Sequence, residues 1–131
     1  MKKNHSRIVL AALTAATLAL AGCSSAEPTD TGAPEPQETG TIVTVTETEF
    51  AITLSDSSLS PGVYTFEISN EGGTAHNFHI SGPGVDDASS SSVSSGSTTS
   101  LTVTLEAGTY TVWCAIGGHR DQGMEATVEV G

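Results

Sequence analysis

The chain has 131 residues, of which 37% are hydrophobic and 15% are charged. Its 15 Asp and Glu residues outnumber its 4 Lys and Arg residues, which gives a formal net charge of −11 at pH 7 with histidine neutral. So acidic a chain is poorly suited to binding nucleic acid or anionic lipid headgroups, and we expect no nucleic-acid partner.

Residues 1–22 have the layout of a secretory signal peptide. The basic segment MKKNHSR precedes an apolar run of 14 residues, IVLAALTAATLALA, which is too short for a membrane-spanning helix. The sequence Leu-Ala-Gly-Cys at 20–23 resembles a bacterial lipoprotein signal, which implies cleavage before Cys23 and a diacylglycerol group on its sulfur. An ordinary cleavage site with an incidental cysteine is the alternative. Several acyl chains such as palmitate hold a protein stably at a membrane. We therefore expect a lipid anchor at the cell membrane, with the domain on the extracytoplasmic side.

Residues 23–40 comprise the lipidated cysteine and a predicted disordered, acidic tether. The segment SSAEPTDTGAPEPQETG has three prolines, four acidic residues and no large apolar residue, a composition that cannot form a core. Its 17 residues give a root-mean-square reach of roughly 20–25 Å. Cleavage leaves Arg120 as the one Lys or Arg against 15 acidic residues, a net charge of −14. That charge permits steering toward a basic partner, although solubility alone also explains it.

Residues 41–131 are predicted to form one domain of short strands. Apolar residues alternate with polar ones in several rows, and turn signals rich in Gly, Pro and Asn separate them. Seven or so strands of this kind indicate a β-sandwich or a small barrel. The rows are Phe50, Ile52 and Leu54; Tyr64, Phe66 and Ile68; Leu101, Val103 and Leu105; Tyr110, Val112 and Cys114; and Met124, Ala126, Val128 and Val130.

One segment departs from this pattern. Residues 82–100, GPGVDDASSSSVSSGSTTS, are rich in serine and long for a loop in a compact domain. We expect a mobile surface excursion, with room for a short helical turn near Val85 and Asp86, and the sequence assigns it no function.

Cys114 is one of only two cysteines in the chain. If Cys23 carries lipid, Cys114 has no partner for an intramolecular disulfide, and an exported free thiol should have a use. His119 and Met124 follow at intervals of five in CAIGGHRDQGM. Cys114 ends one expected strand and Met124 begins the next, both on the core-facing side, while the glycines between them allow a tight loop that carries His119. Thiol, imidazole and thioether are therefore expected at one end of the domain.

This mixture of ligand types suits copper that cycles between Cu(I) and Cu(II). A trigonal site of two histidines and a cysteine with a weak axial methionine needs one more histidine. His76 and His79, in TAHNFHISG, are the candidates. We choose His76 because it shares the core-facing side of its expected strand and lies near the loop 70–75, whereas His79 is interpreted as a half-exposed strand residue. Ordinary core and loop residues are the plainer interpretation of the whole set.

The residues His76-Asn77 and Cys114-x₄-His119-x₄-Met124 resemble the cupredoxins, small blue copper proteins of the plastocyanin and azurin type. The resemblance covers essentially residues 41–131 and implies a Greek-key β-sandwich of about seven to eight strands with one type 1 copper. It implies a thiolate bond from Cys114, ring nitrogens of His76 and His119 in the trigonal plane, and an axial Met124 that tunes the potential. Asn77 would tie the two ligand-bearing segments together by hydrogen bonds.

The resemblance also implies an electron exit at His119, in an apolar surface ring that includes Ala115, Ile116 and Gly117. Related loops often have proline where this chain has Gly117, which leaves the potential open. Trp113, on the opposite side of its strand from Cys114, is expected to pack rather than to conduct electrons. Arg120 is expected to pair with Asp121 or Glu125.

The function predicted from the sequence is single-electron transport between redox protein partners by a monomeric, membrane-anchored domain. An enzyme is not expected, because copper enzymes of this fold place a histidine beside the blue-site cysteine, and the neighbours here are Trp113 and Ala115. A Ser-His-Asp triad would have to consume a copper ligand. A copper carrier or storage protein is the alternative function, and a metal-free adhesive sandwich would leave Cys114 unexplained.

Overall fold

The computed structural model describes residues 40–131. The expectations for the signal peptide 1–22, for lipidation of Cys23 and for nearly all of the tether 23–40 lie outside the described residues. Among those described, no helix is long and apolar enough to cross a membrane.

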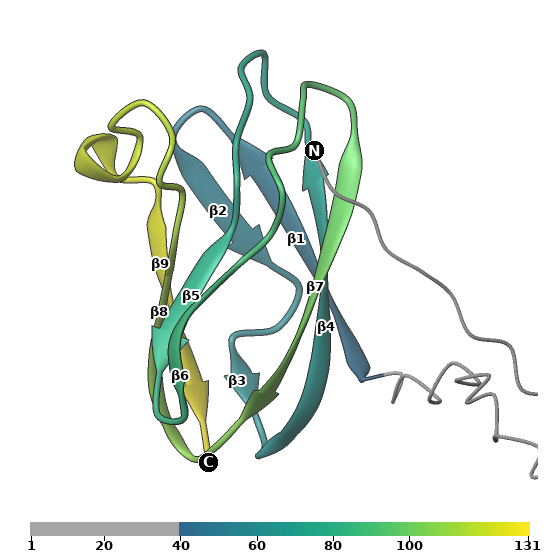
Figure 1. The fold of residues 1–131 in the computed structure, drawn as a ribbon, viewed down its shortest axis with the longest axis vertical. Coiled ribbons are helices and arrows are strands. Elements are labelled where there is room, and N and C mark those ends of the chain that lie inside the picture. The colour runs from purple at the N-terminus through teal and green to yellow at the C-terminus, as the bar shows by residue number, and fades with distance from the viewer. Residues whose placement is uncertain (1–39) are drawn as a thin grey trace, which may run out of the picture. The chain divides into compact units, whose positions relative to one another are not determined.

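The described residues form a sandwich of two β-sheets (Figure 1). One sheet has the strand order β2-β1-β4-β7 and the other β3-β9-β8-β5-β6. The all-β prediction is confirmed, with nine strands instead of seven to eight because β6 and the two-residue β3 add to the expected set. The strands are β1 (Thr41–Thr48), β2 (Ala51–Leu54), β3 (Ser58–Leu59), β4 (Gly62–Asn70), β5 (His79–Gly82), β6 (Val85–Ser89), β7 (Thr98–Leu105), β8 (Gly108–Trp113) and β9 (Glu125–Val130), and a 3-10 helix, η1 (Arg120–Gln122), precedes β9.

The chain passes repeatedly between the two sheets, which gives the Greek-key connectivity. β1 pairs in parallel with β4, and β3 pairs in parallel with β9. The other neighbours, including β4 with β7 and β8 with β5 and β9, pair antiparallel. Strands that are neighbours in a sheet are therefore often distant in sequence, so long-range pairing builds the frame that carries the site.

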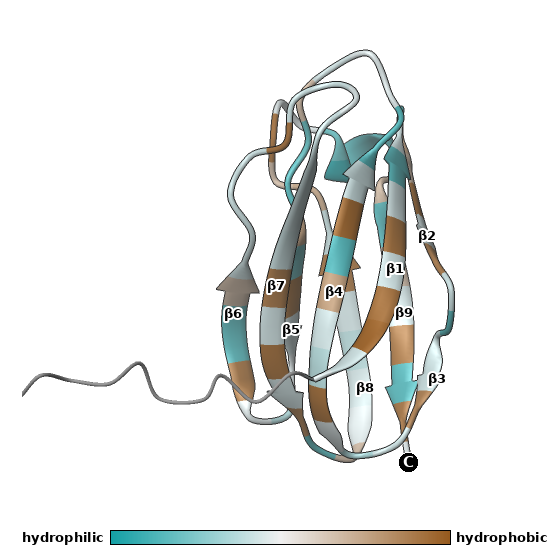
Figure 2. Ribbon diagram, turned by 90° about the vertical axis from the view of Figure 1, so that its right-hand side faces the viewer, coloured by the Kyte–Doolittle hydropathy of each residue, from teal (hydrophilic) through white to brown (hydrophobic). Residues whose placement is uncertain are grey.

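The core lies between the sheets and follows the alternation of the strands. Figure 2 shows apolar and polar bands alternating along β1, β4 and β7, as expected for strands with one buried face. The ring of Phe66 from β4 lies 5.2 Å from that of Phe78, which precedes β5 in the other sheet. Contacts of this kind join the sheets. The buried apolar residues include Val43, Val45, Phe66, Ile68, Phe78, Ile80, Val93, Leu105, Tyr110, Val112, Cys114, Met124 and Val128.

The serine-rich segment 82–100 was wrongly predicted as a mobile loop with a helical turn. Val85 begins strand β6, which forms an antiparallel hairpin with β5 after a turn at Gly84, where φ is +72°. An edge strand buries little, so it tolerates the serines and aspartates that obscured its period. Beyond it, Val93 is buried and exchanges two backbone hydrogen bonds with His76, at 3.0 and 2.8 Å. Part of this segment therefore holds a candidate ligand in place.

Tyr110 anchors the end of the sandwich that lies away from the candidate ligands. Its buried hydroxyl donates to the Pro83 carbonyl and accepts from the Glu106 N–H at 2.8 Å. The close approach requires Gly82, because a Cβ there would lie 2.4 Å from the tyrosine ring.

We expect Tyr110→Phe to lower the free energy of unfolding by about 1 kcal/mol, because it removes the hydrogen bonds of the hydroxyl to the Pro83 carbonyl and the Glu106 N–H, which are only partly buried. Urea titration of the purified protein measures the change. The variant should keep the properties of the site at the other end of the sandwich, and an unchanged unfolding midpoint would contradict the assigned role of the hydroxyl.

Candidate metal centre

His76 is held from both sides of its backbone by residues of distant segments. Its N–H and carbonyl bond to Val93. The loop that precedes His76 is organised by Asn70, the last residue of β4. The Asn70 amide donates to the carbonyls of Thr74 and Val93 at 2.7 and 2.8 Å, and its oxygen accepts from the Gly72 N–H at 2.8 Å. Because Asn70 is buried, these three bonds satisfy its amide and fix the approach of the chain to His76.

The loop 114–124 is closed by its own backbone. The Cys114 N–H donates to the Met124 carbonyl at 3.2 Å, and the Met124 N–H donates to the His119 carbonyl at 3.1 Å. Gly117 and Gly118, with φ of 59° and 74°, let the chain fold back over itself before η1. Cys114 and Met124 are buried and His119 is nearly so, so the loop presents all three side chains inward.

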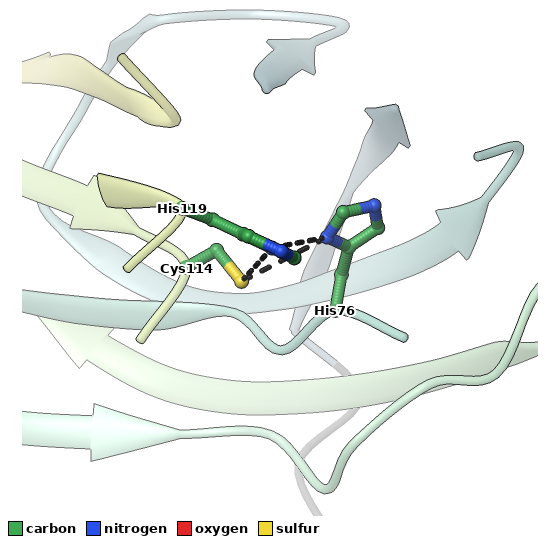
Figure 3. A group of neighbouring side chains, drawn as sticks. All are labelled: His76, Cys114 and His119. Atoms are coloured by element: carbon green, nitrogen blue, oxygen red, sulfur yellow. Dashed lines mark hydrogen bonds between the residues drawn. The ribbon is translucent and has the colours of Figure 1, made fainter. Parts of the chain in front are cut away.

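Three potential donor atoms meet at this end of the sandwich (Figure 3). Nδ1 of His76 lies 3.1 Å from Nδ1 of His119. Sγ of Cys114 lies 3.6 Å from Nδ1 of His119 and 3.9 Å from Nδ1 of His76. Donors bound to one ion at about 2.0–2.3 Å, the lengths found at zinc sites, lie about 3–4 Å from one another. The triangle is therefore the size that a single metal ion requires.

The strand expected to contain both His76 and His79 begins only at His79, and His76 forms an isolated bridge with Val93. His76 is nevertheless buried and His79 partly exposed, as predicted. The Met124 side chain is buried beside the loop, and His79 lies in β5 with its ring on the outer face, away from the three donors. The Asn77 oxygen accepts from the Ala115 N–H at 2.8 Å. This bond joins the residue after His76 to the residue after Cys114.

Comparison with protein families identifies the group to which this arrangement belongs. The model of the copper binding proteins of the plastocyanin/azurin family matches residues 40–131. The chain is a member of that family. Members of this cupredoxin family carry electrons and are not enzymes, so the expectation of a non-enzyme is confirmed by family membership. No protein among the curated sequences matches the chain at a significant level.

Several solved cupredoxins share its fold. Dithionite-reduced auracyanin from the photosynthetic bacterium Roseiflexus castenholzii is 18% identical, with a TM-score of 0.59 over 71% of this chain and 98% of that chain. Auracyanin A, described as a blue copper protein from the green thermophilic photosynthetic bacterium Chloroflexus aurantiacus, is 20% identical, with a TM-score of 0.59 over 70% and 99%. Auracyanin B is 22% identical, with a TM-score of 0.57 over 69% and 88%. At these identities the likeness shows the fold.

The donor set of this cupredoxin fits copper, the cofactor of the family. Two imidazole nitrogens, a thiol sulfur and a nearby thioether are the ligand types that copper accepts in both of its oxidation states. Burial and the neighbouring His119 lower the pKa of His76, while the nearby Glu49 acts in the opposite direction. A lowered pKa keeps the imidazole neutral, with a lone pair available for a metal.

Glu49 is a residue of the site that sequence analysis missed. It follows β1, and its Oε1 lies 3.7 Å from Nε2 of His76. The same oxygen accepts from the N–H groups of Gly73 and Thr74, at 2.6 and 2.9 Å. Hydrogen bonds from the backbone, that of Thr74 first, lower the pKa of Glu49 to about 2, so a negative charge stands beside the outer edge of His76. No local sequence pattern predicts this contact, because Glu49 and its partners Gly73 and Thr74 are 24 to 25 residues apart in the chain.

Phe50 was placed in a core-facing row by its alternation with Ile52, and this was wrong. It lies in the turn between β1 and β2, is 36% exposed, and packs edge-on against His119 with ring centroids 5.2 Å apart. The row of alternating apolar residues therefore begins at Ile52, the first buried residue of β2. Phe50 and the partly buried Ile116 are therefore both apolar side chains near His119.

The packing of Trp113 and the ion pair of Arg120, both expected from the sequence, are confirmed. Trp113 packs on its strand neighbour His79, with ring centroids 5.3 Å apart. Arg120 forms an ion pair with Glu125, and its guanidinium carbon lies 4.4 Å from the centroid of the Trp113 ring.

Gly117 has a backbone conformation that excludes proline from this position of the loop. Its φ of +59° is out of reach for proline, whose ring fixes φ near −65°. We expect Gly117→Ala to cost about 1 kcal/mol of unfolding free energy, because an L-residue is strained in the left-handed region. The added Cβ would also lie 3.4 Å from Nε2 of His119, which should shift the His119 ring resonances in NMR spectra of the copper-free protein.

Gly123→Ala is the matched control for this change. Its φ of +102° imposes strain as well, but a Cβ there meets nothing within 4 Å. Both variants should be destabilised in urea titrations, and the effect on the His119 resonances should be confined to the Gly117 variant. Equal resonance shifts in the two variants would contradict a direct contact.

Proposed function

We propose that this cupredoxin is a membrane-anchored, extracytoplasmic carrier of single electrons between redox protein partners. In this proposal His76, Cys114 and His119 would hold one type 1 copper, and Met124 would be a further, weaker ligand. The observation that carries the proposal is the buried triangle of two Nδ1 atoms and one Sγ, with edges of 3.1, 3.6 and 3.9 Å.

The site is built to change its oxidation state with little movement. Copper bound there would supply a one-electron couple between Cu(I) and Cu(II). The protein fixes the donors in advance: Val93 holds His76 by two backbone hydrogen bonds, and the loop from Cys114 to Met124 closes on itself. Donors that stay in place in both oxidation states keep the reorganisation small, which favours electron transfer over release of the metal.

Electron exit through His119 is the natural route in this geometry. His119 is the donor side chain nearest to solvent, at 9% exposure, while His76 and Cys114 are fully buried. Phe50 and Ile116 lie around it and would offer an apolar contact to a partner. The net charge of −14 after cleavage would favour a partner with a basic surface.

The direction of β1 fits a tethered domain. The strand begins at Thr41, and Glu49, just after its end, approaches His76. Eight residues at about 3.3 Å each separate those ends by about 26 Å. Figure 1 accordingly shows β1 starting at the lower end of the sandwich and the loop 114–124 at the upper end. An anchor attached before β1 would leave the metal end free to meet partners.

Redox cycling in the presence of a chelator tests the electron-carrier proposal. The copper-loaded protein is reduced with ascorbate and reoxidised with ferricyanide several times, with an excess of a Cu(I)-specific chelator in solution. We expect one electron per copper in each cycle and retention of the metal, measured by atomic absorption. Transfer of the copper to the chelator in the first reduction would instead establish a copper carrier and overturn the proposal.

The anchor is tested separately by Cys23→Ser in the full-length protein. We expect the variant to leave the membrane fraction and to retain its copper spectrum, because the change removes the lipidated sulfur but leaves the domain intact. Retention of the variant in the membrane fraction would contradict anchoring through this residue.

A further inference from the structure

A row of hydrogen bonds crosses the outer face of the sheet beside the copper site. Nδ1 of His79 lies 2.9 Å from Oδ1 of Asp87 in β6. Nε2 of the same ring lies 3.0 Å from Nδ2 of Asn77, whose Oδ1 accepts from the Ala115 N–H at 2.8 Å. The row thus runs from a carboxylate on an edge strand to the residue that follows Cys114.

The ring of His79 is held in its plane by the neighbouring strand. It pairs in register with Trp113 of β8 and stacks on the indole, with an interplanar angle of 25°. The indole of Trp113 is also in contact with the guanidinium of Arg120. With its side chain only 16% exposed, His79 is a fixed hydrogen-bonding group and not a free surface side chain.

The direction of each bond in the row follows from its chemistry. A backbone N–H can only donate, so the atom of Asn77 that faces Ala115 must be the amide oxygen. The amide nitrogen then faces His79 and donates, so Nε2 of His79 must offer a lone pair. A neutral imidazole with a lone pair on Nε2 carries its proton on Nδ1, which is the atom that faces the acceptor Asp87. One tautomer therefore satisfies all three bonds at once.

We propose that His79, oriented by Asp87, is a positioning residue for the copper site that acts through Asn77. Its consequence for electron transfer rests on the proposed function, whereas the hydrogen-bond row is a property of the protein without copper. The lone pair on Nε2 selects the orientation of the Asn77 amide in which its oxygen reaches Ala115. The reversed amide would set the NH₂ group against the Ala115 N–H and open the link between the two ligand-bearing segments.

The link matters because it joins the backbone beside two of the proposed ligands. Asn77 follows His76, and Ala115 follows Cys114, so the amide bridges the segments that must keep the nitrogen and the sulfur at their separation. Residues that orient ligands from outside typically change metal affinity by 10- to 100-fold when replaced. Since His79 acts one contact farther out, we expect His79→Leu to weaken Cu(II) binding by about tenfold.

The direct test is NMR of the copper-free mature protein at pH 8. Nitrogen-15 shifts of the His79 ring report the tautomer, and hydrogen exchange at the Ala115 amide reports the link. We expect the proton on Nδ1. In His79→Leu, we expect Ala115 exchange faster by about fivefold or more, the scale of one lost hydrogen bond. His79→Gln offers an amide oxygen in place of Nε2 and should restore most of the protection.

Asp87→Ala and Asp86→Ala form a matched pair, because each removes one acidic side chain from β6. Only Asp87 contacts the ring of His79, so only Asp87→Ala should raise the population of the other tautomer and speed Ala115 exchange. A proton on Nε2 in the unaltered protein, or equal Ala115 exchange in the unaltered protein and in His79→Leu, would overturn the proposal.

The outcomes separate this proposal from the proposed function. An intact row in the copper-free protein together with no blue copper spectrum would remove the electron-carrier function and keep the positioning of Asn77. A blue, redox-active protein whose Ala115 exchange and Cu(II) affinity are the same in His79→Leu would keep the function and remove the role of His79.

Discussion

Replacing Cys114 with serine is expected to abolish the intense red-region absorption of the Cu(II) protein. The band requires a thiolate bound to copper, and Cys114 supplies the one sulfur in the triangle of donors. Serine is nearly the same size, so the domain should remain folded, at a cost of about 1–3 kcal/mol for burying a hydroxyl without a partner. A titration with Cu(II), followed by visible absorption and circular dichroism, measures both.

Met124→Leu is the control for the loss of colour. Leucine keeps the buried apolar volume and the backbone bonds of Met124 to Cys114 and His119, and it removes only the proposed axial sulfur. We expect this variant to stay blue, with a changed reduction potential. If Cys114→Ser kept the intense band, the thiolate assignment would be wrong. If neither the unaltered protein nor Met124→Leu showed the band, the type 1 site itself would be excluded.

Glu47→Gln is expected to stabilise the folded protein by about 3 kcal/mol at pH 9 and to change little at pH 4. Glu47 lies on the core-facing side of β1 with 0% exposure, and neither of its carboxylate oxygens has a hydrogen-bond partner among the described residues. Burial raises the pKa of Glu47 from 4.5 to about 7. This pKa difference between the unfolded and folded states corresponds to about 3 kcal/mol of unfolding free energy, because one pKa unit is worth about 1.36 kcal/mol.

The direction of the pH dependence follows from the raised pKa of Glu47, because the folded protein binds this proton more tightly than the unfolded chain does. Below pH 4.5 the Glu47 carboxyl is neutral in both states and carries no ionisation penalty. As the pH rises from 4.5 to about 7, the unfolded chain loses the proton first, so the stability of the fold declines. Above about pH 7 the penalty is complete, and glutamine, which has no charge, avoids it.

Urea titrations of both proteins across pH 4 to 9, without copper, measure this prediction. The difference in unfolding free energy between Glu47→Gln and the unaltered protein cancels the titration of the exposed carboxylates, which the two share. It should grow through the window between pH 4.5 and about 7. A difference that stays constant with pH would show that Glu47 is solvated or paired in solution.

The sequence predicts most of the fold and the ligand set, because both depend on local patterns. Alternation along Tyr64, Phe66 and Ile68 marks a half-buried strand, and Cys114, His119 and Met124 lie within one loop whose spacing is visible in the chain. Strand parity also separates His76 from His79, since only one of two residues three apart can face the core. The order of these residues carries the resemblance to the family, and the match of the family model shows the membership.

The sequence does not predict what depends on contacts between turns and loops. Glu49 and Phe50 reach the site because the turn after β1 lies against the loop before His76 and against His119. Strand β6 was not predicted because an edge strand needs few apolar residues, so its sequence shows no clear alternation. The tautomer inferred for His79 depends on Asp87, Asn77 and, through Asn77, on Ala115, and no periodicity encodes such a set.

The separation of the ligands along the chain determines when the site can form. His76 and Cys114 are 38 residues apart, and the sheets that bring them together contain parallel pairs between strands distant in sequence. Chains with such distant pairings fold slowly, in milliseconds to seconds, because loop closure precedes the stabilising contacts. A nascent chain therefore offers no complete metal site until its sandwich is assembled, and we expect the ion to bind the already folded domain, through the side where His119 meets solvent.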